Sequence, residues 1–129
     1  MNLDFASVWE MISDIVPENN ALICGDEIVS WKDYDDRSSK IASALSNAGL
    51  KANSKAGLYL NNSNEYLIGQ NAIFKIGGVP INVNYRYVAE ELIYLLDNSD
   101  SEAVFYHACY SSRIKAVSYT HLRAHETGY

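Results

Sequence analysis

The chain has 129 residues, a hydrophobic content of 48% and a formal net charge of -6. This length leaves room for one domain at most, and the composition is that of an ordinary globular protein. The acidic balance argues against a nucleic-acid partner, because phosphate binding needs clustered Lys and Arg and the basic residues here are scattered. No apolar run reaches the roughly 18 residues of a membrane span, and the N-terminus lacks the basic start of a secretory leader. We therefore expect a cytoplasmic protein without a transmembrane segment.

The two cysteines, Cys24 and Cys109, lie far apart and show no metal-ligand spacing. This pattern favours buried, unpaired thiols in a reducing compartment, with a disulfide as the alternative.

The first part of the chain predicts a helix followed by a hairpin. Phe5 to Ile15 has apolar residues near helical spacing, and Pro17 blocks its continuation. Two apolar runs, Ala21 to Cys24 and Glu27 to Trp31, flank Gly25-Asp26, which is a typical signal of a tight β-turn.

From Ser30 onward, helices and strands alternate. Ser30 is a predicted helix N-cap, and the helix that it opens ends at Gly49. The following elements are a strand at Ala56 to Leu60, a helix carrying Tyr66, Ile73 and Phe74 that stops at Gly77-Gly78, a strand at Val79 to Val83, a helix at Val88 to Leu96 and a strand at Ala103 to Tyr106. Strands separated by single helices predict an α/β fold with a parallel sheet, built as one continuous piece.

Arg86 is the strongest candidate for a binding residue. It lies in the loop Asn84-Tyr85-Arg86-Tyr87, directly after a predicted parallel strand. The carboxyl edge of a parallel sheet is where α/β folds bind ligands, and a guanidinium pairs well with phosphate oxygens. The alternative is a surface arginine that pairs with Glu90 or Glu91 at the start of the next helix.

Other polar residues predict no site. Asp35 and Asp36 next to Arg37 are expected to be solvated charges on an exposed helix face. His107 stands at the end of an apolar strand without a nucleophile or metal partner nearby in the sequence, so we expect an edge histidine. We predict no catalytic residue and no metal site.

The run from Phe74 to Leu96, FKIGGVPINVNYRYVAEELIYLL, resembles the N-terminal region of the adenylate-forming acyl-CoA synthetases and ligases. The same resemblance includes two shorter segments, Ser30-Trp31-Lys32-Asp33-Tyr34 and Leu58-Tyr59-Leu60-Asn61-Asn62. The sequence of the longer run is most similar to the fatty-acyl-CoA synthetase branch. The resemblance implies a partial three-layer parallel-sheet subdomain of the large N-terminal domain of these enzymes.

The resemblance also implies an activity for a longer parent protein. Such a parent uses ATP and Mg²⁺ to convert a small-molecule carboxylic acid to an acyl-adenylate, and then transfers the acyl group to coenzyme A (CoA). By the same resemblance, Arg86 lies where relatives carry an arginine that meets the phosphates of CoA.

The present chain lacks the parts that do this chemistry in the family. The Ser/Thr/Gly-rich phosphate loop ending in Pro-Lys-Gly, the acidic residue for the ribose and the catalytic lysine lie downstream in relatives. Gly77-Gly78 has no third glycine and no partner lysine, so it is a helix end rather than a phosphate loop. We expect no turnover and no tight cofactor binding by this chain alone, and an incomplete sheet that favours aggregation.

Two alternative functions remain open. One is the N-terminal part of another adenylating enzyme, either an aryl-CoA ligase or a carrier-protein-loading domain. The other is a non-catalytic, flavodoxin-like nucleotide-binding module.

The final residues, 117–129, are predicted to be foreign to the fold. Val117 to Thr127, VSYTHLRAHET, matches the translation of the end of a transposase-based sequencing-library adapter. We therefore divide the chain into residues 1–116, a truncated N-terminal part of an AMP-binding domain, and residues 117–129, an adapter-derived tail. The helical spacing of His121 and His125 is accordingly not counted as a metal-ligand pair.

Overall fold

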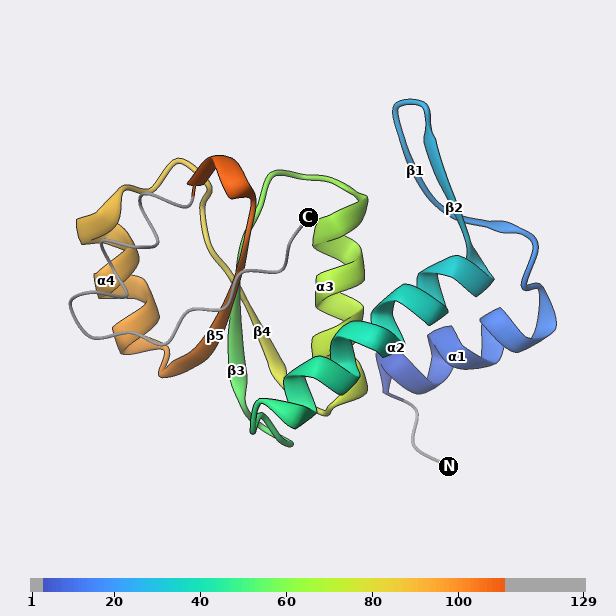
Figure 1. Ribbon diagram of the computed structural model, residues 1–129, viewed down its shortest axis with the longest axis horizontal. Helices are drawn as coiled ribbons and strands as arrows, with labels where there is room; N and C mark the ends of the chain where they lie inside the picture. The colour runs from blue at the N-terminus through green and yellow to red at the C-terminus, as the bar shows by residue number, and fades with distance from the viewer. Residues whose placement is uncertain (1–3, 111–129) are drawn as a thin grey trace.

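The computed structural model describes residues 4–110, which form an α/β fold with two separate sheets (Figure 1). Along the chain the elements are α1 (Phe5–Ile15), β1 (Asn20–Cys24), β2 (Glu27–Ser30), α2 (Trp31–Asn47), β3 (Lys55–Tyr59), α3 (Asn64–Lys75), β4 (Val79–Asn82), α4 (Ala89–Asn98) and β5 (Ser101–Tyr106), followed by a 3-10 turn at Ala108–Tyr110. The order and type of the predicted helices and strands are confirmed. The predicted tail lies outside the described residues.

The N-terminal half is a helix, a hairpin and a second helix. β1 and β2 pair in antiparallel fashion around Gly25, whose φ of 58° is readily adopted only by glycine and a few polar residues. The Ser30 hydroxyl accepts a hydrogen bond of 3.1 Å from the backbone N–H of Asp33. This cap starts α2 at Trp31, so the strand predicted to reach Trp31 ends one residue earlier.

The second sheet is parallel, with the strand order β4-β3-β5. The connection through α3 moves from β3 to its neighbour β4, whereas the connection through α4 returns across β3 to β5. Because both crossovers of a parallel sheet are right-handed, the reversal of direction places α3 and α4 on opposite faces. Figure 1 shows this arrangement, with α4 on one side of the sheet and α2 and α3 on the other.

The core is divided by the sheet into two clusters. Leu58 of β3 and Phe105 of β5 face α2 and α3, where they pack with Ala72 and Ile73 of α3. On the opposite face Leu92 and Leu96 of α4 pack with the side chains of Tyr59, Val83, Val104 and Tyr106. Alternate residues of each strand thus serve opposite faces, which gives three layers: α2 and α3, the sheet, and α4.

The predicted stop of α3 at two glycines is confirmed. Gly77 has a φ of 73°, and the backbone N–H of Gly78 donates to the carbonyl of Ile73 at 2.9 Å. These features close the helix in the Schellman manner and lead directly into β4.

Both cysteines differ from the prediction of buried thiols. Cys24 and Cys109 are exposed and unpaired. Leu22 is the buried residue of β1, whereas Cys24 lies beside the turn at the tip of the hairpin, which projects beyond α2 (Figure 1). Cys109 lies past the end of β5. Within residues 4–110, no helix combines the length and apolar character required to cross a bilayer.

Candidate functional site

The candidate site is a crevice at the carboxyl ends of β3 and β4. The loops after these two strands leave toward opposite faces, because α3 and α4 lie on opposite sides of the sheet. The carboxyl ends of parallel strands are the edge of the sheet at which α/β folds bind their ligands. A cavity of about 380 Å³ occupies this position, and its walls come from the two loops and the helices that follow them: Leu60, Asn62, Tyr66, Asn82, Val83, Asn84, Tyr85, Tyr87 and Leu95.

Amide and hydroxyl groups give the crevice its polar character. The hydroxyl of Tyr66 donates to Oδ1 of Asn82 at 2.8 Å, and burial raises the pKa of this tyrosine. The phenol therefore stays neutral at physiological pH and serves as a hydrogen-bond donor. Asn62 and Asn84 add two further amides to the wall. These groups can hydrogen-bond a polar ligand, but none of them is a nucleophile or a general base at neutral pH.

The loop after β4 has a defined conformation. Oδ1 of Asn84 accepts a hydrogen bond of 2.9 Å from the backbone N–H of Arg86, as in an Asx turn. The hydroxyl of Tyr59 donates to the carbonyl of Tyr87, so the buried face of β3 anchors the far end of the loop.

Arg86 is exposed at the rim of this crevice, between two residues that line it. Its guanidinium lies 5.4 Å from the centre of the Tyr85 ring. Within residues 4–110 it forms no ion pair, so the alternative pairing with Glu90 or Glu91 is not found. The structure confirms the place of Arg86 at the carboxyl edge, whereas binding of CoA phosphates stays a prediction.

The polar edge continues at the end of β5. The hydroxyl of Tyr110 donates to Oδ1 of Asn61 at 2.6 Å, and the ring centres of Tyr110 and Tyr59 are 4.9 Å apart. His107 lies directly after β5, with its ring 6.1 Å from that of Tyr110, which agrees with the predicted edge position. Among the described residues, no group of three His, Cys, Asp or Glu side chains is placed to hold a metal ion.

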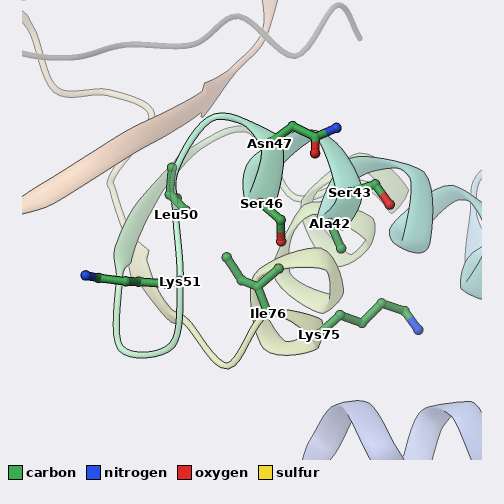
Figure 2. A pocket seen from close by; sticks show the side chains of 8 residues that line it. All are labelled: Ala42, Ser43, Ser46, Asn47, Leu50, Lys51, Lys75 and Ile76. Atoms are coloured by element: carbon green, nitrogen blue, oxygen red, sulfur yellow. The ribbon is translucent and has the colours of Figure 1, made fainter.

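A second cavity, of about 540 Å³, lies at the other end of the sheet, where α2 and α3 end and β3 and β4 begin. Figure 2 shows its lining, with Lys51 and Lys75 pointing in opposite directions and Lys75 extending toward α1. Lys75 is already bonded to two carboxylates, to Asp35 at 2.7 Å and to Glu10 at 2.9 Å. The amino end of a parallel sheet and a lysine already held in ion pairs make this cavity a weaker candidate than the crevice.

Lys75 corrects one prediction from the sequence. Asp35 is not a solvated surface charge: its side chain is 29% exposed and bonded to Lys75, whereas Asp36 is exposed as expected. Burial alone would lower the pKa of Lys75, but the hydrogen bonds and charges of Asp35 and Glu10 outweigh it, and the pKa lies above its usual value. Nothing in the local pattern marks Lys75, because its partners come from two other helices.

Comparison with known proteins identifies the family. The sequence profile of the family described as AMP-binding enzyme matches residues 13–127. The chain belongs to this family. The match also includes most of the tail predicted to derive from an adapter, and that origin stays a prediction.

A curated relative is similar to this chain in sequence over most of its length. The chain is 38% identical over 115 residues to the medium/long-chain-fatty-acid–CoA/3-oxocholest-4-en-26-oate–CoA ligase of Mycobacterium tuberculosis, which covers 89% of this chain and 21% of the relative. The chain thus spans about a fifth of the length of this relative. The predicted resemblance to acyl-CoA synthetases is confirmed.

Solved structures show the same fold. The putative long-chain-fatty-acid CoA ligase of Rhodopseudomonas palustris aligns with a TM-score of 0.88 at 22% identity, over 98% of this chain and 33% of that one. The N-terminal domain of FACL13 from Mycobacterium tuberculosis aligns with a TM-score of 0.87 at 19% identity, over 98% and 34%. The predicted α/β subdomain of the N-terminal domain of adenylate-forming enzymes is therefore confirmed.

Proposed function

We propose that the chain is the N-terminal part of a longer, AMP-forming acid–CoA ligase that acts on a fatty acid or a similarly apolar carboxylic acid. ATP and Mg²⁺ would activate the carboxylate of the substrate as an acyl-adenylate, and CoA would then accept the acyl group. The main support for this proposal is the 38% identity, over 89% of the chain, to a ligase named for medium- and long-chain fatty acids. The expected location is the cytoplasm, and the net charge of -6 supports the absence of a nucleic-acid partner.

The role proposed for this chain is to build one wall of the binding crevice. Arg86 would hold phosphate oxygens of CoA, because its guanidinium is exposed at the carboxyl edge and forms no ion pair among residues 4–110. The Asn84 side chain would keep the loop in place through its bond to the Arg86 backbone. The crevice residues bind and orient, and the reacting groups would come from elsewhere in the longer protein.

The chain by itself is proposed to be inactive. Gly77 and Gly78 close helix α3, and their backbone N–H groups bond to carbonyls of that helix. This turn therefore offers no set of free backbone N–H groups that could bind ATP phosphates. Labelled palmitate mixed with the purified chain, ATP, Mg²⁺ and CoA should yield neither palmitoyl-adenylate nor palmitoyl-CoA. Thioester formation by the pure chain would contradict the proposal.

The decisive experiment starts from the DNA. The reading frame in an independent sample should continue beyond Lys115 into a Ser/Thr/Gly-rich segment that ends in Pro-Lys-Gly. The protein encoded by that longer frame should then convert fatty acids to their CoA thioesters. A frame that ends with the same tail would instead favour a self-contained nucleotide-binding module.

Arg86→Ala in the longer protein tests the binding residue. The KM for CoA should rise about tenfold, because a charge-assisted contact to phosphate is lost, while ATP–pyrophosphate exchange in the absence of CoA should stay unchanged. Arg37→Ala, which removes an arginine from α2 away from the crevice, is the matched control and should alter neither value. An unchanged KM for CoA in the Arg86 variant would remove Arg86 from the site.

A further inference from the structure

Helix α1 leaves several large apolar side chains exposed. Ala6 and Ser13, each 6% exposed, are its buried residues, whereas Met11 is 42% exposed and Ile15 is 71% exposed. With the half-buried Val8 and Ile12, these residues follow the i, i+3, i+4, i+7 spacing of one helix face. We call Val8, Met11, Ile12 and Ile15 the α1 stripe.

The α1 stripe lies at one end of the molecule. Figure 1 shows α1 beyond α2 and α3, on the side remote from the sheet, and the β1–β2 hairpin projects from the same end. The hairpin adds another exposed apolar pair, because Ile23 and Ile28 are register partners with 66% and 58% exposure. Soluble proteins seldom leave several large apolar side chains exposed together unless the surface binds a partner.

The charge of the chain is concentrated in the same region. Residues 1–31 contain no Lys or Arg, and they hold the acidic residues Asp4, Glu10, Asp14, Glu18, Asp26 and Glu27. The rest of the chain carries equal numbers of acidic and basic residues, so the whole net charge of -6 belongs to this N-terminal segment. Glu10 is bonded to Lys75, whereas Asp14 and Glu18 are exposed and form no ion pair within residues 4–110. The pKa of Lys32 is raised mainly by Asp36, and Glu18 is close enough to that lysine to raise it further.

We propose that the α1 stripe is a docking surface for a basic amphipathic helix of a partner protein. Apolar residues of that helix would cover Met11 and Ile15, and its Lys or Arg side chains would meet the carboxylates of Asp14 and Glu18. Helix-in-groove recognition uses this combination of an apolar stripe and complementary charge at its border.

The charges decide between occupants. Anionic lipid surfaces attract basic amphipathic helices, and α1 carries acidic residues and no basic one. A second copy of the chain would bring the same carboxylates against each other across a two-fold axis. A basic helix satisfies the apolar stripe and its acidic border together.

The test uses two labelled synthetic helical peptides with the same leucine face, one with lysine and one with glutamate on the polar face. The lysine peptide should bind the chain saturably in fluorescence anisotropy, and binding should weaken as salt rises, because exposed ion pairs are screened. Ile15→Asp should weaken binding about tenfold or more. Tyr94→Asp is the matched control, because Tyr94 is an equally exposed aromatic residue, 74% exposed, on α4 across the sheet.

Each other result overturns the proposal. Equal binding of the lysine and glutamate peptides would mean that the carboxylates beside the α1 stripe do not select a basic partner. Self-association that Ile15→Asp abolishes would assign the stripe to a second copy, and binding to anionic vesicles that Ile15→Asp abolishes would assign it to a membrane. With the exposed Cys24 and Cys109 replaced by serine, protection of Ile15→Cys from thiol labelling in the longer protein, but not in this chain, would mean that the rest of that protein covers the stripe.

Discussion

Lys75 joins three helices at one point. It is the last residue of α3, its side chain is 9% exposed, and it binds Glu10 of α1 and Asp35 of α2. Lys75→Met should lower the free energy of unfolding by about 1–2 kcal/mol, because two carboxylates lose their shared cation at a partly buried position. Urea unfolding at neutral pH measures the change.

The exposed pair of Lys32 and Asp36 is the control for Lys75. Both side chains are more than half exposed, 61% and 52%, although their separation of 3.0 Å is similar. Lys32→Met should leave the free energy of unfolding nearly unchanged, since water and salt screen such a pair. Equal losses in the two variants would mean that burial does not strengthen the Lys75 pairs.

Tyr34 makes the stability of the fold depend on pH in the alkaline range. The side chain is 4% exposed, its hydroxyl donates to the carbonyl of Leu67 at 3.3 Å, and burial raises its pKa from 10.0 to about 12. The unfolded chain loses the phenol proton near pH 10 and the folded chain near pH 12. The stability contribution of the neutral phenol is therefore complete below pH 10 and is lost as the pH rises toward 12.

Tyr34→Phe should separate this effect from the rest of the fold. At neutral pH the variant should lose about 1 kcal/mol with the hydrogen bond, and its stability should fall less steeply than that of the wild type between pH 10 and about 12. Urea unfolding across this range measures both, and the exposed Tyr94→Phe should follow the wild type. Parallel curves for Tyr34→Phe and the wild type would contradict the assignment.

At the scale of elements, the turn between α3 and β4 has no room for a side chain at Gly78. A Cβ there would lie 2.8 Å from the Ser54 carbonyl oxygen and 3.0 Å from Cγ2 of Ile73. The Ser54 carbonyl already accepts the Val79 N–H at 2.8 Å, at the start of the β3–β4 pairing, so it is not free to move. Gly78→Ala should destabilise the chain by about 2 kcal/mol through overpacking.

Gly25 is the matched glycine for this comparison. It has a positive φ of 58°, but nothing lies within 4 Å of a Cβ built on it. Gly25→Ala should therefore cost only the backbone strain, about 1 kcal/mol. Chemical unfolding ranks the two variants, and a larger loss for Gly25→Ala would mean that backbone conformation outweighs packing at these turns.

At the scale of the whole molecule, the parallel sheet is narrow and open. Within residues 4–110, β4 and β5 each pair on one side alone, and an unpaired strand edge promotes association with other chains. Pro80 in β4 removes one N–H donor from that edge, which is a usual place for proline in a sheet. The outer edge of β5 has no such protection in its sequence.

We expect this chain to self-associate with rising concentration and to melt over a broad range, and the longer protein to melt more sharply. Analytical ultracentrifugation and calorimetry of the two proteins measure the difference. A monodisperse monomer with a sharp cooperative transition would contradict this expectation.

The sequence by itself determined the order and type of the helices and strands, and two of the helix ends. The hydroxyl of Ser30 caps α2 and Gly77-Gly78 closes α3, because these signals act through the backbone within a few residues. The position of Arg86 in the loop after β4 also follows from local sequence signals, because it depends only on where that strand ends.

Only the tertiary structure decided how these elements meet. It sent α3 and α4 to opposite faces of the sheet, which leaves the crevice beside the loops after β3 and β4, and it brought Lys75 to Glu10, 65 residues away in the sequence. It also left Cys24 and Ile15 exposed, although cysteine and isoleucine are among the residue types most often buried in folded proteins. Such features depend on which faces pack together, and long-range packing leaves no local pattern in the chain.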